Sequence, residues 1–258
     1  MTSTRDVSLS NQPNRVSKVT TETDLTVAVA TEIAKQLPVK EALAPPARQT
    51  GEVLQDIVKT VQLALAPIQL AGALQDRLRH FLDNSVRRVP EAHRITPPPQ
   101  VLGPIIEAIR YEPEGTDIDA MFSELLSASM NEARIQDVHP AFASIIRSLS
   151  SDEAKLLKAL AAGPIGLIFT QRLDYGRSLF ERAVIEKLDL PDGLAHPENG
   201  HTSLTRLVQL GLISEQPVRA GDPIITDGKQ TGLRTFSEYF LTPWGKQFMR
   251  AAAPVNDV

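Results

Sequence analysis

The chain has 258 residues, of which 42% are apolar, and a formal net charge of −4. That is enough apolar material for one or two modest folded domains, so a wholly disordered chain is excluded. The absence of cysteine excludes disulfides, thiolate metal sites and cysteine nucleophiles, and it favours a reducing, cytoplasmic location.

The first part of the chain is predicted to be a tail followed by helices. Residues 1–24 are rich in Ser, Thr and Asn, so we expect a disordered tail rather than a signal peptide or an anchor. Helices are predicted over Leu25–Leu37 and from about Arg48 to Ala66. The apolar segment Val53–Leu74 is interrupted by charges and by Pro67, so no integral membrane segment is expected. A core-facing helix is favoured there over one lying on a membrane surface.

A third helix is predicted from Leu70 to Val89, where apolar residues recur every three or four positions. It carries the one local concentration of basic residues: Arg77, Arg79, His80, Arg87, Arg88 and, just beyond it, Arg94. Such a cluster could contact nucleic acid or anionic lipid. A solvated helix face is the favoured interpretation, because Asp76, Asp83 and Glu91 offset the charge.

Three short helices are then predicted after the proline-rich connector Glu91–Pro99 and a helix over Val101–Tyr111. Thr116 and Asp119 resemble a capping pair for the first of them, which should end near Ala133. The second begins after His139, where Pro140 takes a favoured first position. Ser150 and Glu153 form a capping box for the third, which Gly163 and Pro164 should end.

The sequence pattern changes after Pro164, where strand-like apolar runs appear at Ile165–Phe169 and Phe236–Leu241. A short helix at Leu204–Leu210 is closed by Gly211, and Leu212–Val218 could pair with Thr235–Leu241 as a hairpin around a polar, Gly-rich loop at Gly221–Gly232. Thr242 and Pro243 should start a last helix. This order of elements is typical of a winged helix.

The predicted fold is therefore mainly α: a helical bundle domain followed by a small winged-helix-like α+β domain. The expected boundaries are a tail at 1–24, a helical domain at 25–162, the winged-helix-like domain at 163–253, and a tail at 254–258.

The segment from about Val39 to Leu160 resembles the abortive infection alpha family of bacterial and prophage proteins. Its opening matches at Ala44-Pro45-Pro46-Ala47, at Gly51 and at Leu63-Ala64-Leu65-Ala66-Pro67. The central signature matches at Met121, Phe122, Leu125, Leu126, His139, Pro140, Phe142, Ile145, Ile146, Leu149, Asp152 and Glu153. The resemblance implies a role in phage defence, in which infected cells stop growing or die before phage mature. It implies no catalytic residues, and these motif residues are expected to be structural.

Three kinds of enzyme site can be weighed against simpler interpretations. A metal-dependent nuclease would use Asp192 and Asp227 with Lys229, but Asp192-Gly193 and Asp227-Gly228 are ordinary turn dipeptides. His196, Glu198 and His201 could ligate zinc, although a solvated loop is favoured because no fourth ligand is near. His139 has no positioned acid or serine, so a helix-start role is expected. No catalytic residue, metal or cofactor is predicted.

Nucleic-acid binding through a winged helix would need positive charge. From Ser151 onward there are twelve Lys and Arg against thirteen Asp and Glu, and the recognition helix would offer only Arg206 and Gln209 to DNA. Binding of a protein partner, from the host, the phage or the chain itself, is therefore favoured. A DNA-binding regulator and, more remotely, a nuclease effector remain as alternatives.

Overall fold

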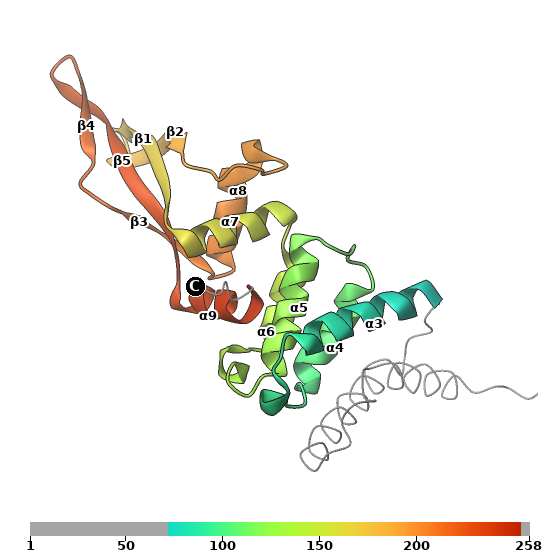
Figure 1. Cartoon of the computed structure of the whole chain (residues 1–258). Helices are drawn as coiled ribbons and strands as arrows, with labels where there is room; N and C mark the ends of the chain where they lie inside the picture. Colours follow the sequence, from blue (N-terminus) through green and yellow to red (C-terminus); the bar gives the residue numbers. More distant parts are fainter. Residues whose placement is uncertain (1–71, 254–258) are drawn as a thin grey trace, which may run out of the picture.

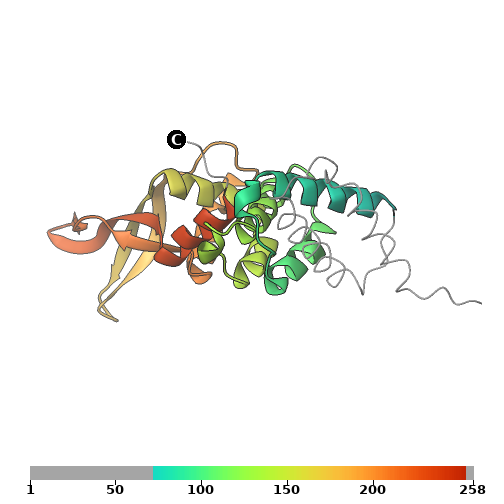
Figure 2. The same cartoon turned by 60° about the horizontal axis from the view of Figure 1, so that its bottom comes forward.

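The computed structural model describes residues 72–253. In this part of the chain seven α-helices and five strands form an elongated molecule, with helices at one end and a sheet at the other (Figure 1, Figure 2). The helices are α3 Gly72–Arg87, α4 Pro99–Ile109, α5 Asp117–Ser129, α6 Ala141–Ser148, α7 Ser151–Ala162, α8 Gly200–Gln209 and α9 Pro243–Ala252. The strands are β1 Ile165–Asp174, β2 Leu179–Leu188, β3 Ile213–Pro217, β4 Asp222–Thr226 and β5 Lys229–Leu241.

Several predictions fall outside the described residues. They are the tails at 1–24 and 254–258, the helices at Leu25–Leu37 and Arg48–Ala66, nearly all of Val53–Leu74, and the opening of the family resemblance. The third predicted helix is present as α3. The connector Glu91–Pro99 is less extended than expected, because residues Glu91–His93 form a turn of 3₁₀ helix.

Side-chain caps set the helix starts where the sequence predicted them. The hydroxyl of Thr116 accepts the N–H of Asp119 at the start of α5. Ser150 and Glu153 form the reciprocal capping box of α7. Thr242 accepts the N–H of Gly245 at the start of α9. Each cap satisfies a backbone donor that a helix terminus leaves unpaired, so these boundaries could be read locally.

Helix α5 is the centre of the helical part, and every residue from Met121 to Met130 is buried. Its serines let α3 approach closely, because they are small and find hydrogen-bond partners inside the core. Ser123 shares a 3.0 Å hydrogen bond with Ser85 of α3, and the Ser127 hydroxyl donates to the Ser85 carbonyl at 2.9 Å. The polar groups at this contact are therefore satisfied within the interface.

An aromatic cluster joins α6 to α9. The ring of Phe142 lies 4.7 Å from that of Trp244 and 5.2 Å from that of Phe248, centroid to centroid. The start of α9 also lies against the backbone after α8, since a Cβ added at Gly245 would stand 1.9 Å from the carbonyl oxygen of Leu212. Only glycine fits there. Helix α9 is therefore held both by the aromatic cluster and by this close contact with the backbone of Leu212.

The sheet is antiparallel, with strand order β2-β1-β5-β3, and β4 pairs with the first part of β5. Ile165, Leu167 and Phe169 of β1 alternate inward and are buried in the core. The predicted pairing of Leu212–Val218 with Thr235–Leu241 is confirmed, because β3 runs antiparallel to β5 with Ile213 opposite Leu241.

The predicted fold class, a mainly α helical bundle followed by a small winged-helix-like domain, is wrong. The described residues are 48% helix and 24% strand, and the sheet is a curled antiparallel one of five strands. The largest omission was β2 and the second half of β1. These strands face water on their outer half, so charged residues such as Arg172 and Glu181 interrupt the apolar runs that mark a buried strand.

The prediction of a Gly-rich loop at Gly221–Gly232 was also wrong in part. It contains β4, a tight turn and the start of β5. Asp227 and Gly228 both have positive φ, at 51° and 75°, which is the conformation of a two-residue hairpin turn. The turn was visible in the sequence, and its flanking strands were not, because they are polar and mostly exposed.

The buried side chains of the helices and the sheet form one cluster that runs from Leu78 of α3 to Ala252 of α9. The domain boundary between residues 162 and 163 stays a prediction, because it concerns which parts of the chain can fold independently.

Candidate functional site between α3 and α5

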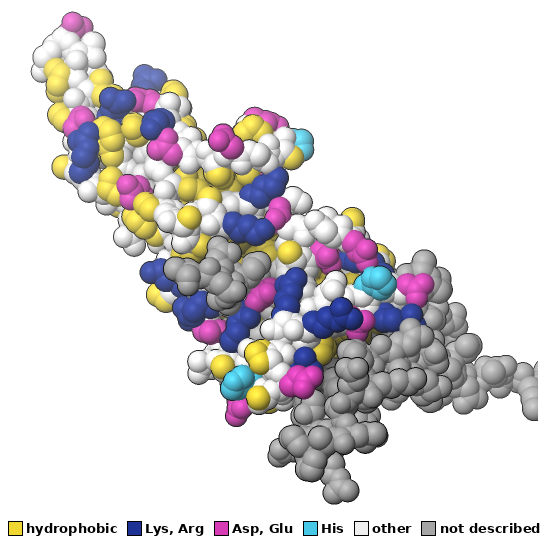
Figure 3. Space-filling view, viewed as in Figure 1, with side chains coloured by type: hydrophobic (Ala, Val, Ile, Leu, Met, Phe, Trp, Pro, Cys, Tyr) yellow, Lys and Arg dark blue, Asp and Glu magenta, His cyan; other side chains and the backbone are white. Residues whose placement is uncertain are grey.

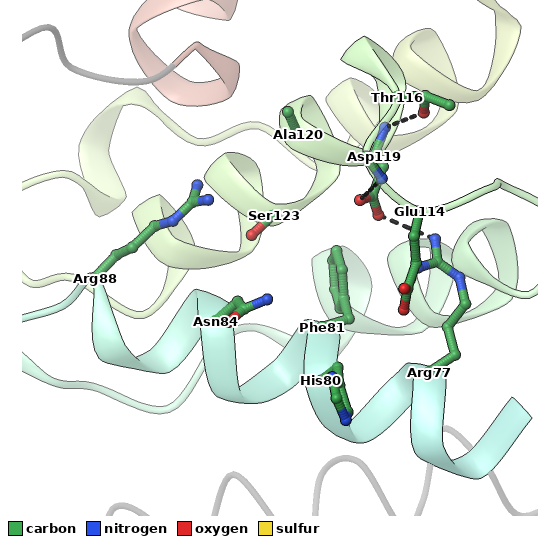
Figure 4. A pocket seen from close by; sticks show the side chains of 11 residues that line it. Arg77, His80, Phe81, Asn84, Arg88, Glu114, Thr116, Asp119, Ala120 and Ser123 are labelled. Carbon is green, nitrogen blue, oxygen red and sulfur yellow. Dashed lines mark hydrogen bonds and ion pairs between the residues drawn. The ribbon is translucent and has the colours of Figure 1, made fainter. Parts of the chain in front are cut away.

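A recess of about 450 Å³ lies between α3 and the beginning of α5 (Figure 4). Its walls come from α3 between Arg77 and its end, from the loop that leads into α5, and from the first turns of α5. The lining residues are Arg77, His80, Phe81, Asn84, Arg88, Glu114, Gly115, Thr116, Asp119, Ala120 and Ser123. The basic cluster identified from the sequence contributes three of them, Arg77, His80 and Arg88.

Arg77 closes one end of the recess. Its guanidinium lies 3.0 Å from a carboxylate oxygen of Glu114 and 3.1 Å from one of Asp119, and it donates to the carbonyl of Glu112 at 2.6 Å. Asp119 in turn accepts the N–H of Gly115. Arg77 therefore holds the loop before α5 against α3, and its charge is offset by two carboxylates.

Arg88 borders the other end of the recess and is bound to a buried carboxylate. Its Nη1 donates to Glu124 at 3.1 Å, and the second oxygen of Glu124 accepts from Arg134 at 2.5 Å. The Glu124 side chain is only 5% exposed, whereas that of Arg88 is 45% exposed. Arg88 can thus keep this ion pair and still offer donors to a ligand in the recess.

The middle of the recess is polar but not strongly charged. His80 and Asn84 are exposed on α3, Phe81 is buried behind them, and the Ser123 hydroxyl is shared with Ser85. Of the two arginines of the lining, Arg77 is paired with Glu114 and Asp119, and Arg88 is paired with Glu124. In the view of Figure 3, basic side chains over the helices lie beside acidic ones. Such a lining suits hydrogen bonds to a protein segment better than phosphate neutralisation.

The other nominated basic residues are placed as follows. Arg79 pairs with Asp76 on α3 at 3.2 Å. Arg87 is exposed at the end of α3. Arg206, on α8, lies far from this cluster along the chain, and it donates at 2.5 Å both to Glu153 of α7 and to the carbonyl of Ser148.

The residues of the family signature mostly lie in the core. Met121, Phe122, Leu125, Leu126, Phe142, Ile146, Leu149, Asp152 and Glu153 are buried, Ile145 is half-buried, and His139 and Pro140 are exposed at the start of α6. The His139 ring accepts the N–H of Ala141 at 3.1 Å and packs edge-on against Trp244. These contacts give His139 a role in starting α6 and in holding α9.

Asp152 ties the loop before α8 to α7. Its two carboxylate oxygens accept the N–H groups of Ala195 and His196, each at 2.8 Å. The hydrogen bond from Ala195, then the one from His196 and the nearby charge of Lys155, hold the pKa of Asp152 below its ordinary value despite partial desolvation. Asp152 therefore favours the folded loop only while it is ionised.

We expect the stability difference between the wild type and Asp152→Asn to depend on pH in the acid range. Because the folded-state pKa of Asp152 is lower than its unfolded value of about 3.9, its contribution is fully present above that value and is lost as pH falls through the folded pKa. Urea unfolding of both proteins should show a constant gap above about pH 5 that narrows below about pH 4. A gap that does not change down to the acid transition would contradict this role.

The residues weighed as metal or nuclease sites lie in loops and turns. His196 contacts Glu198 at 3.2 Å on an exposed 3₁₀ turn, and the segment 72–253 has no group of three or more His, Cys, Asp or Glu side chains placed to hold a metal ion. Asp192 lies in the loop between β2 and α8, whereas Asp227 occupies the β4–β5 turn. The two carboxylates come from different loops of the fold.

Within residues 72–253, no helix is long and apolar enough to cross a membrane. The family model described as abortive infection alpha matches residues 71–252, which is most of the chain. The chain belongs to the abortive infection alpha family. The comparison with curated proteins gives no significant match, and neither does the comparison with solved structures. Membership of the abortive infection alpha family thus covers the recess, the aromatic cluster and the sheet together.

Sequence reasoning missed Asn84, Ser123, Glu124 and Arg134. The strongest overlooked signal was Glu124, an acidic residue in the middle of the apolar stripe of α5. A carboxylate on a buried helix face costs free energy unless a charged or hydrogen-bonding partner compensates it. That argument predicts a cationic partner for Glu124, and the structure identifies Arg88 and Arg134 as the two partners.

Proposed function

We propose that this protein acts in abortive phage defence by binding a protein partner, in the cytoplasm and without catalysing a reaction. Family membership supports the defence role. The observation that carries the binding mode is the recess between α3 and α5, where exposed His80 and Asn84 stand between two arginines that are already paired with carboxylates. A neutral, hydrogen-bonding recess selects a protein segment over a polyanion.

The test is phage challenge of a susceptible bacterium that expresses the full chain, at low and at high phage dose. Abortive defence predicts that the culture survives only the low dose, because single infected cells are lost while the population is spared. We expect the double variant His80→Ala, Asn84→Ala to fold normally and to lose this low-dose survival, since both side chains are exposed and neither supports the core.

Arg87→Ala is the matched control, because Arg87 is exposed on the same helix but does not line the recess. It should protect as well as the wild type. Full protection by the double variant at equal protein level would refute the recess as the binding site. Loss of protection in Arg87→Ala alone would point instead to an anionic partner at the end of α3.

A further inference from the structure

The strand β2 and the turn before it carry an unusual concentration of exposed apolar side chains. In the described residues, nine large hydrophobic side chains are exposed, and five of them belong to β2 or to the turn before it. They are Tyr175, Leu179, Phe180, Val184 and Ile185, with Val184 57% exposed. Among the strands of residues 72–253, β2 is the end strand of the sheet and pairs with β1 alone (Figure 1). An edge strand with apolar side chains is a ready template for another strand.

Two irregularities in the pairing with β1 give β2 a particular spacing on its outer face. The register with β1 shifts at two points, so the residues opposite Arg172, Thr170 and Ile168 are Glu181, Val184 and Lys187, three positions apart. Because Leu167 and Phe169 point into the core, these three residues of β2 point to the opposite, outer face. Phe180 and Leu188 lie opposite Leu173 and Leu167, on the inner face.

This spacing makes β2 complementary to itself in one antiparallel register. If Val184 lies opposite Val184 of a second copy, Glu181 lies opposite Lys187 of that copy, and Lys187 opposite its Glu181. Phe180 then lies opposite Leu188. Every outer residue meets an outer residue, every such charge meets its opposite, and the two-fold symmetry is that of a C₂ dimer.

Neighbouring registers fail on charge or on face. A shift by one residue sets Glu181 opposite Glu186 of the other copy, which are like charges. A shift in the other direction sets Glu181, on the outer face, opposite Leu188, on the inner face. Pairing on a buried or half-buried face tolerates no such slip.

We propose that two copies of this chain associate through antiparallel pairing of their β2 strands, with Val184 on the two-fold axis. The main-chain groups along the free edge of β2 supply the hydrogen bonds, and the apolar side chains at Phe180, Val184 and Leu188 are covered by the pairing. In the monomer Glu181 contacts Arg177 at 3.2 Å and Lys187 contacts Asp189 at 2.7 Å. Both pairs are exposed, so they can exchange for the intermolecular ones at little cost.

Cross-linking of the full chain tests the axis directly, because the native sequence has no cysteine. Residues directly opposite in antiparallel strands have Cα atoms about 4.5 to 5.5 Å apart, which a disulfide can span. We expect Val184→Cys to form a covalent dimer under mild oxidation. The control is Val208→Cys, on the exposed side of α8, which should stay monomeric on a non-reducing gel.

A charge swap tests the register by sedimentation equilibrium. Glu181→Lys alone, or Lys187→Glu alone, sets like charges opposite each other twice and should weaken dimerisation about ten-fold or more. The double variant Glu181→Lys, Lys187→Glu should restore it. A wild-type chain that stays monomeric at high micromolar concentration overturns the proposal, as does equal cross-linking of both cysteine variants or a double variant no better than the single ones. β2 lies apart from the recess, so this outcome is independent of the phage assay.

Discussion

Replacing Phe142 by alanine should lower the free energy of unfolding by about 3 to 5 kcal/mol, which is a large share of the stability of a typical domain. The ring is fully buried and contacts Trp244 and Phe248 on α9. Its removal leaves a cavity and also breaks the aromatic packing that joins α6 to α9. Urea or thermal unfolding measures the loss.

Phe142→Leu is the control, because it keeps most of the apolar volume and should cost about 1.5 kcal/mol or less. Trp244 is the only tryptophan of the chain, so its fluorescence reports on this contact without labelling. We expect a red shift in the native emission of Phe142→Ala and little change in Phe142→Leu. If the alanine variant unfolded with wild-type stability, the aromatic cluster would not hold α9 as described.

The second large effect is expected at Glu124. Glu124→Ala should destabilise the protein by about 3 kcal/mol, because it leaves Arg134 and Arg88 without the carboxylate that both of them bind. This is the lower end of the cost of breaking a buried ion pair, since the two arginine side chains are 20% and 45% exposed and water can partly replace the lost partner. Denaturant unfolding of the variant gives the magnitude.

A double-mutant cycle with Arg134→Ala separates the pair from its surroundings. If Glu124 acts through Arg134, the double variant should be less destabilised than the sum of the two single variants. Glu107→Ala is the matched control, because Glu107 pairs with Arg147 on the surface, and the change should stay within about 0.5 kcal/mol. Additive effects of the two single variants would show that Glu124 and Arg134 stabilise the fold independently.

The helical half of the structure could be predicted because its signals are local. Thr116, Ser150 and Thr242 cap the helices within three residues of where they stand, and the stripe of α5 repeats at helical spacing. The sheet was harder, because the partners of β1 are β2 and β5, and the second lies about seventy residues away in the chain. The sequence around Arg172 and Glu181 has no local pattern that distinguishes a half-exposed strand from a loop.

The candidate site was predictable only in part for the same reason. The basic cluster on α3 was evident, but its ion pairs were not, because Glu114, Asp119 and Glu124 reach it from a different helix and loop. Arg206 looked like a groove-binding residue until its partner Glu153, on α7, was known. A charge can be read from the sequence, whereas the identity of the group that neutralises it depends on the tertiary fold.

The position of α9 has a consequence for the order in which the protein can fold. Phe142 is covered by Trp244 and Phe248, which follow it by about a hundred residues, and Gly245 fits against the backbone at Leu212. While the nascent chain is still on the ribosome, the inner side of α6 thus stays open until α9 emerges. A stop codon anywhere before Pro243 removes α9. It should therefore destabilise the core around Phe142 much as a core mutation would, although Phe142 is translated long before that point.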